Sequence, residues 1–154
     1  MTGPAERLAA LGLTLPPVAA PVAAYVPAVR AGGFVYTSGQ LPTVDGKLPA
    51  VGKVGGEVSA PEAAGLARTC ALNAIAAAAA AAGGLDAIGR IVKVTGFVAS
   101  APGFSGQPQV VNGASELLIE VFGEDGTHAR SAVGVAELPL NAPVEVELIA
   151  QIRS

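Results

Sequence analysis

The sequence predicts an α+β fold in which a mixed β-sheet carries two helices packed on one face. Strand-like and helix-like patterns follow one another in the order strands, helix, strand, helix, strands. The chain has 154 residues, of which 51% are hydrophobic, so it is long enough to bury one core. We therefore expect a single domain over residues 1–154, in which residues 1–24 form an N-terminal arm.

Proline, glycine and β-forming residues predict the arm and the first strand. Residues 5–11 can form a short helix, after which the prolines of "LPPVAAPVAAYVP" favour an extended chain. At residues 34–37, "FVYT" combines aromatic and β-branched side chains between glycines, which predicts a strand. Residues 42–58 are rich in Gly, Pro and Lys, and we expect a surface excursion or a weak hairpin there.

The first long helix has clear ends in the sequence. Ser59 and Glu62 form a capping box, and Pro61 falls in the first turn, where its missing N–H costs nothing. The helix is predicted to run through an alanine-rich stretch to Gly83 and Gly84, where a left-handed C-cap can end it. Its small side chains favour close packing against the sheet.

One more helix lies between the remaining strands. "RIVKVTGFVA" alternates over about residues 91–99 and predicts a strand. Apolar residues recur at helical spacing over 108–122, and Gly123 ends that helix. Two further strands are expected at 129–137 and 144–152, joined by a turn that contains Pro and Asn.

Alternation in the last strand predicts which sheet face meets the helices. Val144, Val146, Leu148 and Ile152 share one face, which should face the helices, whereas Glu145 and Glu147 share the other. In the register that we assume, the second face also carries Arg130, Ala132, Gly134 and Ala136. This face is too apolar and too rich in small residues for a free surface, so we expect it to meet another subunit.

Composition excludes several classes of partner. Charged residues make up only 14% of the chain and the net charge is -3, so there is no basic stripe to follow a phosphate backbone, and nucleic acid is disfavoured. The alanine tract is too short to span a bilayer, and we expect no membrane anchor. A lone cysteine, Cys70, forms no internal disulfide or metal cage, which favours a metal-free protein of the cytoplasm.

A few polar residues could carry chemistry. Arg130 could be an ordinary interface arginine paired with a carboxylate, or a clamp whose planar fork binds a substrate carboxylate. Glu145 could be a solvated or interface residue, or could orient a water and move a proton. Asn112 could be an exposed helical residue or a hydrogen-bond donor to a ligand. Ser38 lacks a nucleophile-elbow motif, and His128, the only histidine, is interpreted as a loop residue.

Several blocks of sequence together resemble a known family. They are "YTSGQLP", "ARTCALNAIAAAAAAAGG" followed by "IVKVTGFV", "VNGASE", and "ARSAVGVAELPLNAPVEVELIA". In order and spacing they are similar to the RidA (YjgF) family, labelled in older usage as endoribonuclease L-PSP, over about residues 25–152. The resemblance implies a chorismate-mutase-like fold that assembles as a homotrimer, with three clefts between subunits.

The resemblance also implies an activity and a set of site residues. RidA proteins hydrolyse reactive enamines and imines, such as 2-aminoacrylate, to a 2-keto acid and ammonia without a cofactor. By motif, Arg130 matches the arginine that binds the substrate carboxylate and Glu145 the glutamate that positions water. The substrate-binding positions implied in the same way are Tyr25, Ser38, Gly39, Asn112 and Ala132. Ala132 stands where the family often has cysteine, so any role there falls to the backbone.

Two other functions remain open from the sequence. The older family label suggests a single-strand-specific endoribonuclease or translation inhibitor, although the chain is acidic and lacks a pair of histidines. The other hypothesis is a non-catalytic module that binds a carboxylate metabolite or another protein in the same clefts. The proline-rich arm and the long 42–58 excursion indicate a divergent branch, in which the substrate can differ.

Overall fold

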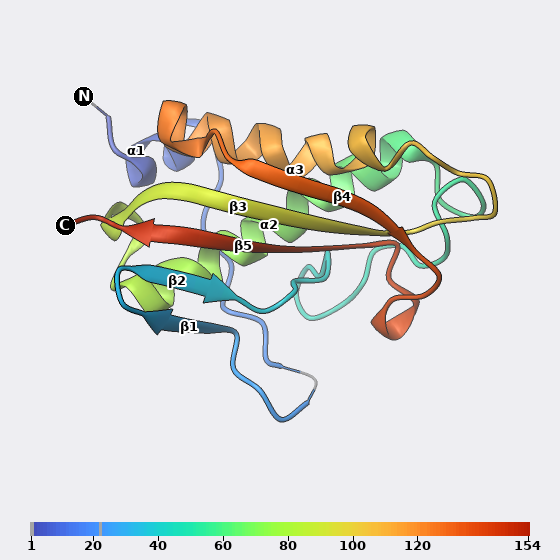
Figure 1. Cartoon of the computed structure of the whole chain (residues 1–154), viewed down its shortest axis with the longest axis horizontal. Helices are drawn as coiled ribbons and strands as arrows, with labels where there is room; N and C mark the ends of the chain where they lie inside the picture. The colour runs from blue at the N-terminus through green and yellow to red at the C-terminus, as the bar shows by residue number, and fades with distance from the viewer. Residues whose placement is uncertain (1, 22) are drawn as a thin grey trace.

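The computed structural model describes residues 2–21 and 23–154 and shows the predicted α+β fold (Figure 1). Its one sheet has the strand order β1-β2-β5-β3-β4. The strands are β1 (Ala28–Ala31), β2 (Phe34–Thr37), β3 (Ile88–Ala99), β4 (Ala129–Val135) and β5 (Val144–Ile152). The α-helices are α1 (Pro4–Ala10), α2 (Ala60–Ala82) and α3 (Gln107–Phe122), with short 3-10 turns η1 (Leu85–Ala87), η2 (Gly123–Gly126) and η3 (Pro139–Asn141). Residues 1 and 22 of the predicted arm lie outside the described residues.

The core helix α2 begins and ends where the sequence predicts. Ser59 Oγ accepts a hydrogen bond from the Glu62 backbone N–H at 3.2 Å. Gly83 is the C-cap and takes the left-handed conformation, with φ 96°. By length and hydropathy α2 could cross a bilayer, but 67% of its apolar 18-residue window is buried inside the molecule. It packs against both the sheet and α3, and we interpret it as the core helix of the domain.

A crossover unit of β3, α3 and β4 decides where Arg130 lies. β4 pairs with β3 in parallel, whereas β5 lies between β2 and β3 and is antiparallel to both. Parallel neighbours need a crossover connection, and α3 supplies it. β4 is therefore the edge strand next to α3 (Figure 1), and it does not pair with β5. The register assumed from the sequence for the last two strands is wrong.

This topology reverses the predicted face of Arg130. Arg130 is in register with Val94 of β3, which is in register with Leu148 of β5, and the last two are buried under the helices. Ala132 packs against the same core, and a Cβ on Gly134 would meet the Gln107 side chain of α3. These three residues lie on the helix face, contrary to the prediction.

The predicted faces of β5 are confirmed. Val144, Val146 and Leu148 are buried on the helix side, while Glu145 and Glu147 alternate with them on the open side. Ile152 is only partly buried at the end of the strand. Ala136 follows the last residue of β4 in a bend, so it belongs to neither face.

The 42–58 excursion is partly a hairpin and is more firmly anchored than a surface loop. Asp45 and Gly46 both have positive φ, and Val44 and Lys47 bridge across them, which makes a tight turn. Further on, Val54 and Val58 are fully buried. The excursion therefore contributes to the core at the end of the sheet where β3 ends.

Candidate functional site

Arg130 lies at the start of β4, and α3 holds its guanidinium. The Nη1 atom donates to Asn112 Oδ1 at 2.8 Å and to Ser115 Oγ at 3.2 Å, while Nη2 donates to the Pro108 carbonyl at 3.3 Å. These contacts use three of the five N–H donors of a guanidinium. Among the described residues, the Nε–H and one Nη2–H are left for another acceptor.

Two other predicted residues lie beside this arginine. Asn112 is on the exposed flank of α3 and contacts Arg130 directly, so it is an acceptor for Arg130 in this structure. Ala132 follows two residues later on the edge strand β4 and shares its face. We call Asn112, Arg130 and Ala132 the Arg130 group.

Glu145 lies on the open face of the central strand β5, directly over Gly39. A Cβ at residue 39 would lie 2.7 Å from Glu145 Cδ, so a residue larger than glycine would force this carboxylate to turn away from its present position. Gly39 is held there because the next residue, Gln40, exchanges two backbone hydrogen bonds with Val146, at 2.8 and 3.0 Å. Burial raises the pKa of the Glu145 carboxyl above its usual value, and the nearby charge of Glu147 raises it further.

The segment before β1 brings Tyr25 and Ser38 to the same end of the sheet. Ser38 Oγ donates to the Val26 carbonyl at 2.6 Å, and the Ser38 N–H donates to the Pro27 carbonyl at 2.8 Å. Tyr25 precedes these contacts and is 44% exposed. We call Tyr25, Ser38, Gly39 and Glu145 the Glu145 group.

Within one chain, the two groups do not form one cleft. Arg130 is on the helix face of the edge strand β4, whereas Glu145 is on the open face of β5, and β3 lies between these two strands. Glu145 is in register with Phe97, three residues along β3 from the partner of Arg130. The sequence therefore identified residues that gather in two places.

The open face of the sheet has apolar side chains in contact with solvent. Val29 is 56%, Tyr36 43% and Val133 41% exposed. They come from β1, β2 and β4, and none of the described helices covers them (Figure 1). Val29 and Tyr36 are paired and form a small apolar patch at one edge of this face, while Val133 lies at the opposite edge. Patches of exposed apolar side chains are typical of surfaces that meet another protein.

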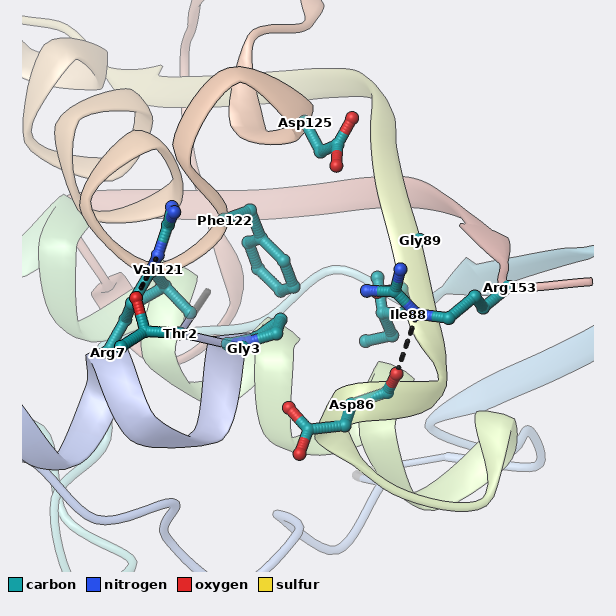
Figure 2. Close-up of a pocket in the computed structure, with 11 residues that line it drawn as sticks. Thr2, Gly3, Arg7, Asp86, Ile88, Gly89, Val121, Phe122, Asp125 and Arg153 are labelled. Atoms are coloured by element: carbon teal, nitrogen blue, oxygen red, sulfur yellow. Dashed lines mark hydrogen bonds between the residues drawn. The ribbon is translucent and has the colours of Figure 1, made fainter.

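Two hollows in the described part of the chain lie away from both groups. One of about 340 Å³ lies between α1, the start of β3 and the end of α3 (Figure 2). Asp86 lines this hollow and connects its walls: the Asp86 carboxylate accepts the Ala5 N–H at 3.0 Å, and the Asp86 backbone carbonyl accepts Arg153 Nε–H at 3.1 Å. The other, of about 400 Å³, lies between the arm and the end of α2. Neither is lined by a predicted site residue.

The structure adds two residues to the Arg130 neighbourhood that the sequence reading missed. Ser115 contacts Arg130, and His128, which does lie in a loop, contacts Ser115 at 2.9 Å. The sequence contained a signal for both residues. Ser115 is three residues after Asn112, which places the two on one side of a helix. His128 is two residues before Arg130, which places the two on one face of an extended chain.

Replacing Glu145 by glutamine is expected to raise the melting temperature at neutral pH. The raised pKa means that the folded protein disfavours the ionised carboxylate, and this penalty is complete above the raised value. It disappears below the ordinary glutamate pKa, because the group is then protonated in both folded and unfolded chains. Melting curves of wild type and Glu145→Gln should therefore differ most at neutral pH and converge as pH falls. A Glu147→Gln control should show a smaller gain, since removing Glu147 leaves the burial of Glu145 unchanged. Curves that stay parallel at every pH would contradict this assignment.

Comparisons with known proteins agree with this fold. A family model described as "YjgF/chorismate_mutase-like, putative endoribonuclease" matches residues 5–152. Protein TCP17 of Trypanosoma cruzi is 44% identical over 151 residues, which is 97% of this chain and 94% of that protein.

Solved structures agree as well. The crystal structure of a "putative endoribonuclease" from Shewanella oneidensis MR-1 is 37% identical, with a TM-score of 0.94 over 97% of this chain and 99% of that one. The crystal structure of E. coli TdcF with bound serine is 29% identical, with a TM-score of 0.63 over 91% of this chain and 94% of that one. These matches confirm the family resemblance that the sequence blocks predicted.

Proposed function

The chain belongs to the YjgF/chorismate mutase-like family, and from this premise we propose that it hydrolyses reactive 2-imino acids and their enamine tautomers to 2-keto acids and ammonia. The observation that carries the proposal is the Arg130 guanidinium, which α3 fixes and which keeps two N–H donors for an outside acceptor. A planar fork of this kind matches a carboxylate. E. coli TdcF, a relative, has been crystallised with bound serine, which carries a carboxylate.

In the proposed reaction Glu145 positions the water. The imine carbon is electrophilic, so the water oxygen bonds to it while a carboxylate accepts one proton from the water. That proton moves to the nitrogen and gives a carbinolamine. The proton of its hydroxyl group is then passed to the same nitrogen, so that the C–N bond breaks and ammonia leaves as the carbonyl forms. A partly buried carboxylate with a raised pKa suits these proton transfers. The protein contributes mainly orientation of the carboxylate and the water, and this reaction requires no cofactor.

We propose that the site is completed between subunits of a homotrimer. The Arg130 group and the Glu145 group lie on different faces of one chain, so a neighbouring chain has to bring the second group to the first. The exposed apolar residues of the open face support such an assembly. Light scattering is expected to give three times the 15.0 kDa mass of one chain, and a monomer at micromolar concentration would remove this part of the proposal.

The test is an imine-decay assay. An amino-acid oxidase or a dehydratase generates 2-iminobutyrate or 2-iminopropionate, and semicarbazide traps the imine that remains. The protein is expected to accelerate the loss of imine in proportion to its concentration, with 2-ketobutyrate or pyruvate and ammonia as products. A decay rate equal to that of a buffer control, with folded protein present, would overturn the proposal.

The same preparation of the protein is used to test two other candidate functions. Thermal stabilisation by 2-ketobutyrate without any turnover would indicate a binding module in place of an enzyme. The family description and the Shewanella structure carry the name endoribonuclease, so single-stranded RNA is the second substrate to offer. Cleavage of that RNA in the presence of a chelator, lost in a site variant, would favour the nuclease.

A further inference from the structure

A line of polar contacts leads from the backbone before β4 to the guanidinium of Arg130. His128 Nδ1 lies 2.6 Å from the Gly126 carbonyl oxygen, and His128 Nε2 lies 2.9 Å from Ser115 Oγ. Ser115 Oγ lies 3.2 Å from Arg130 Nη1. The imidazole and the hydroxyl are both partly buried between α3 and the start of β4.

The Gly126 carbonyl gives this line a direction. A carbonyl oxygen only accepts, so the proton of the neutral imidazole is on Nδ1. Nε2 then carries a lone pair, which accepts the hydroxyl hydrogen of Ser115. With its hydrogen turned toward His128, the Ser115 oxygen presents a lone pair to Arg130 Nη1–H. His128 therefore donates to Gly126 and accepts from Ser115, and Ser115 also accepts from Arg130.

These contacts fix the orientation of the guanidinium plane. Asn112 and Ser115 take hydrogen bonds from Nη1, and Pro108 takes one from Nη2, so three acceptors from α3 fix the plane. A free arginine side chain carries about 2 kcal/mol of rotamer entropy, much of which would be lost when it binds a ligand. An arginine ordered in advance loses less on binding.

We propose that Ser115 and His128 are positioning residues that hold the Arg130 guanidinium in one orientation, with its Nε–H and remaining Nη2–H directed at the substrate carboxylate. This inference rests on the proposed function, because it assigns the ligand of Arg130. A purely structural alternative is that the same contacts only fasten the start of β4 to α3. The two differ in whether ligand affinity changes without a change in stability.

Three variants separate these possibilities. His128→Phe keeps an aromatic ring but removes both nitrogens, Ser115→Ala removes the hydroxyl, and His128→Gln offers an amide oxygen that can accept from Ser115. The first two are expected to raise the dissociation constant for 2-ketobutyrate, and KM for 2-iminobutyrate, by about 3- to 10-fold, the effect of one lost hydrogen bond. The value of kcat should stay within about twofold, because the interaction is equal in ground and transition states. His128→Gln is expected to recover most of the affinity.

The double variant tests whether the residues act as one unit. Ser115→Ala combined with His128→Phe is expected to weaken binding no more than either change alone, since each already breaks the line. Losses that multiply, or single variants with wild-type affinity, would overturn the proposal. Equal loss of melting temperature and of affinity, with no recovery in His128→Gln, would favour the structural alternative.

Nuclear magnetic resonance tests the line without any ligand. His128 is the only histidine, so its ring nitrogens need no assignment. The ring is expected to be protonated at Nδ1 and not at Nε2, and the Arg130 Nε–H signal, identified by its loss in Arg130→Lys, should broaden in His128→Phe. The opposite tautomer, or an unchanged Arg130 signal, would refute the positioning role. If these signals behave as expected but no imine is hydrolysed and no 2-ketobutyrate binds, the proposed function fails and the positioning of Arg130 stands.

Discussion

Replacing Arg130 by alanine is expected to lower kcat/KM for 2-iminobutyrate by about 10²- to 10⁴-fold. The variant loses both N–H donors that the structure leaves for an outside carboxylate. Hydrogen bonds to charged groups contribute about 1.5–3 kcal/mol each, and about 1.4 kcal/mol corresponds to a factor of ten. Most of the loss should be in KM, because the carboxylate takes no part in the bond changes. Initial rates over a range of imine concentrations measure it.

Two other arginine variants serve as controls for Arg130→Ala. Arg130→Lys keeps the charge but loses the planar fork, so it is expected to recover no more than about tenfold of the loss. Arg68→Ala removes an arginine that pairs with Glu120 at 3.0 Å on the exposed side of α2 and α3, and it should retain wild-type kinetics. An Arg130→Ala protein that clears the imine at the wild-type rate would show that the carboxylate binds elsewhere.

Replacing Gly113 by alanine is expected to lower the free energy of unfolding by about 2–3 kcal/mol. Gly113 lies in α3 where the helix crosses α2, and a Cβ there would overlap the carbonyl oxygen of Ala64 and lie 2.7 Å from its carbonyl carbon. Both sides of this contact are backbone, so relief requires the two helices to move apart, a typical cost of overpacking. The melting temperature should fall by about 4–12 °C.

Gly65 provides the matched control on the other helix. It is exposed within α2, and a Cβ there would meet no atom within 4 Å. Gly65→Ala is therefore expected to stabilise the protein by about 0.5–1 kcal/mol, through helix propensity alone. Calorimetry of both variants should give shifts of opposite sign. If both raised the melting temperature, the close crossing of α2 and α3 would be wrong.

Local signals in the sequence were sufficient for most of the elements. The capping box at Ser59 and the glycines at 83 and 123 mark helix ends, because each supplies a hydrogen bond or a conformation that the end requires. Strand pairing has no such local signal. Alternation in residues 129–137 predicts a strand but does not say that it pairs in parallel with β3, and for that reason the face of Arg130 was predicted wrongly.

The site shows the same limit. Sequence blocks identified Arg130 and Glu145, yet no spacing along the chain indicates that they lie on opposite faces of a sheet. The strand β1 was also missed, since Ala28–Ala31 is short and is held by its hairpin with β2 rather than by its own composition. The contact of His128 with Ser115 depends on where the crossover places α3 relative to β4.

The contact between Gly39 and Glu145 constrains how this chain can drift over evolutionary time. A side chain added at 39 would overlap the Glu145 carboxyl group where it now lies, so that group would have to turn away or be lost. Glu145, in contrast, can be replaced by a residue of equal or smaller size while Gly39 is kept. Descendants with a residue larger than glycine at 39 should therefore have either a displaced carboxylate at 145 or none.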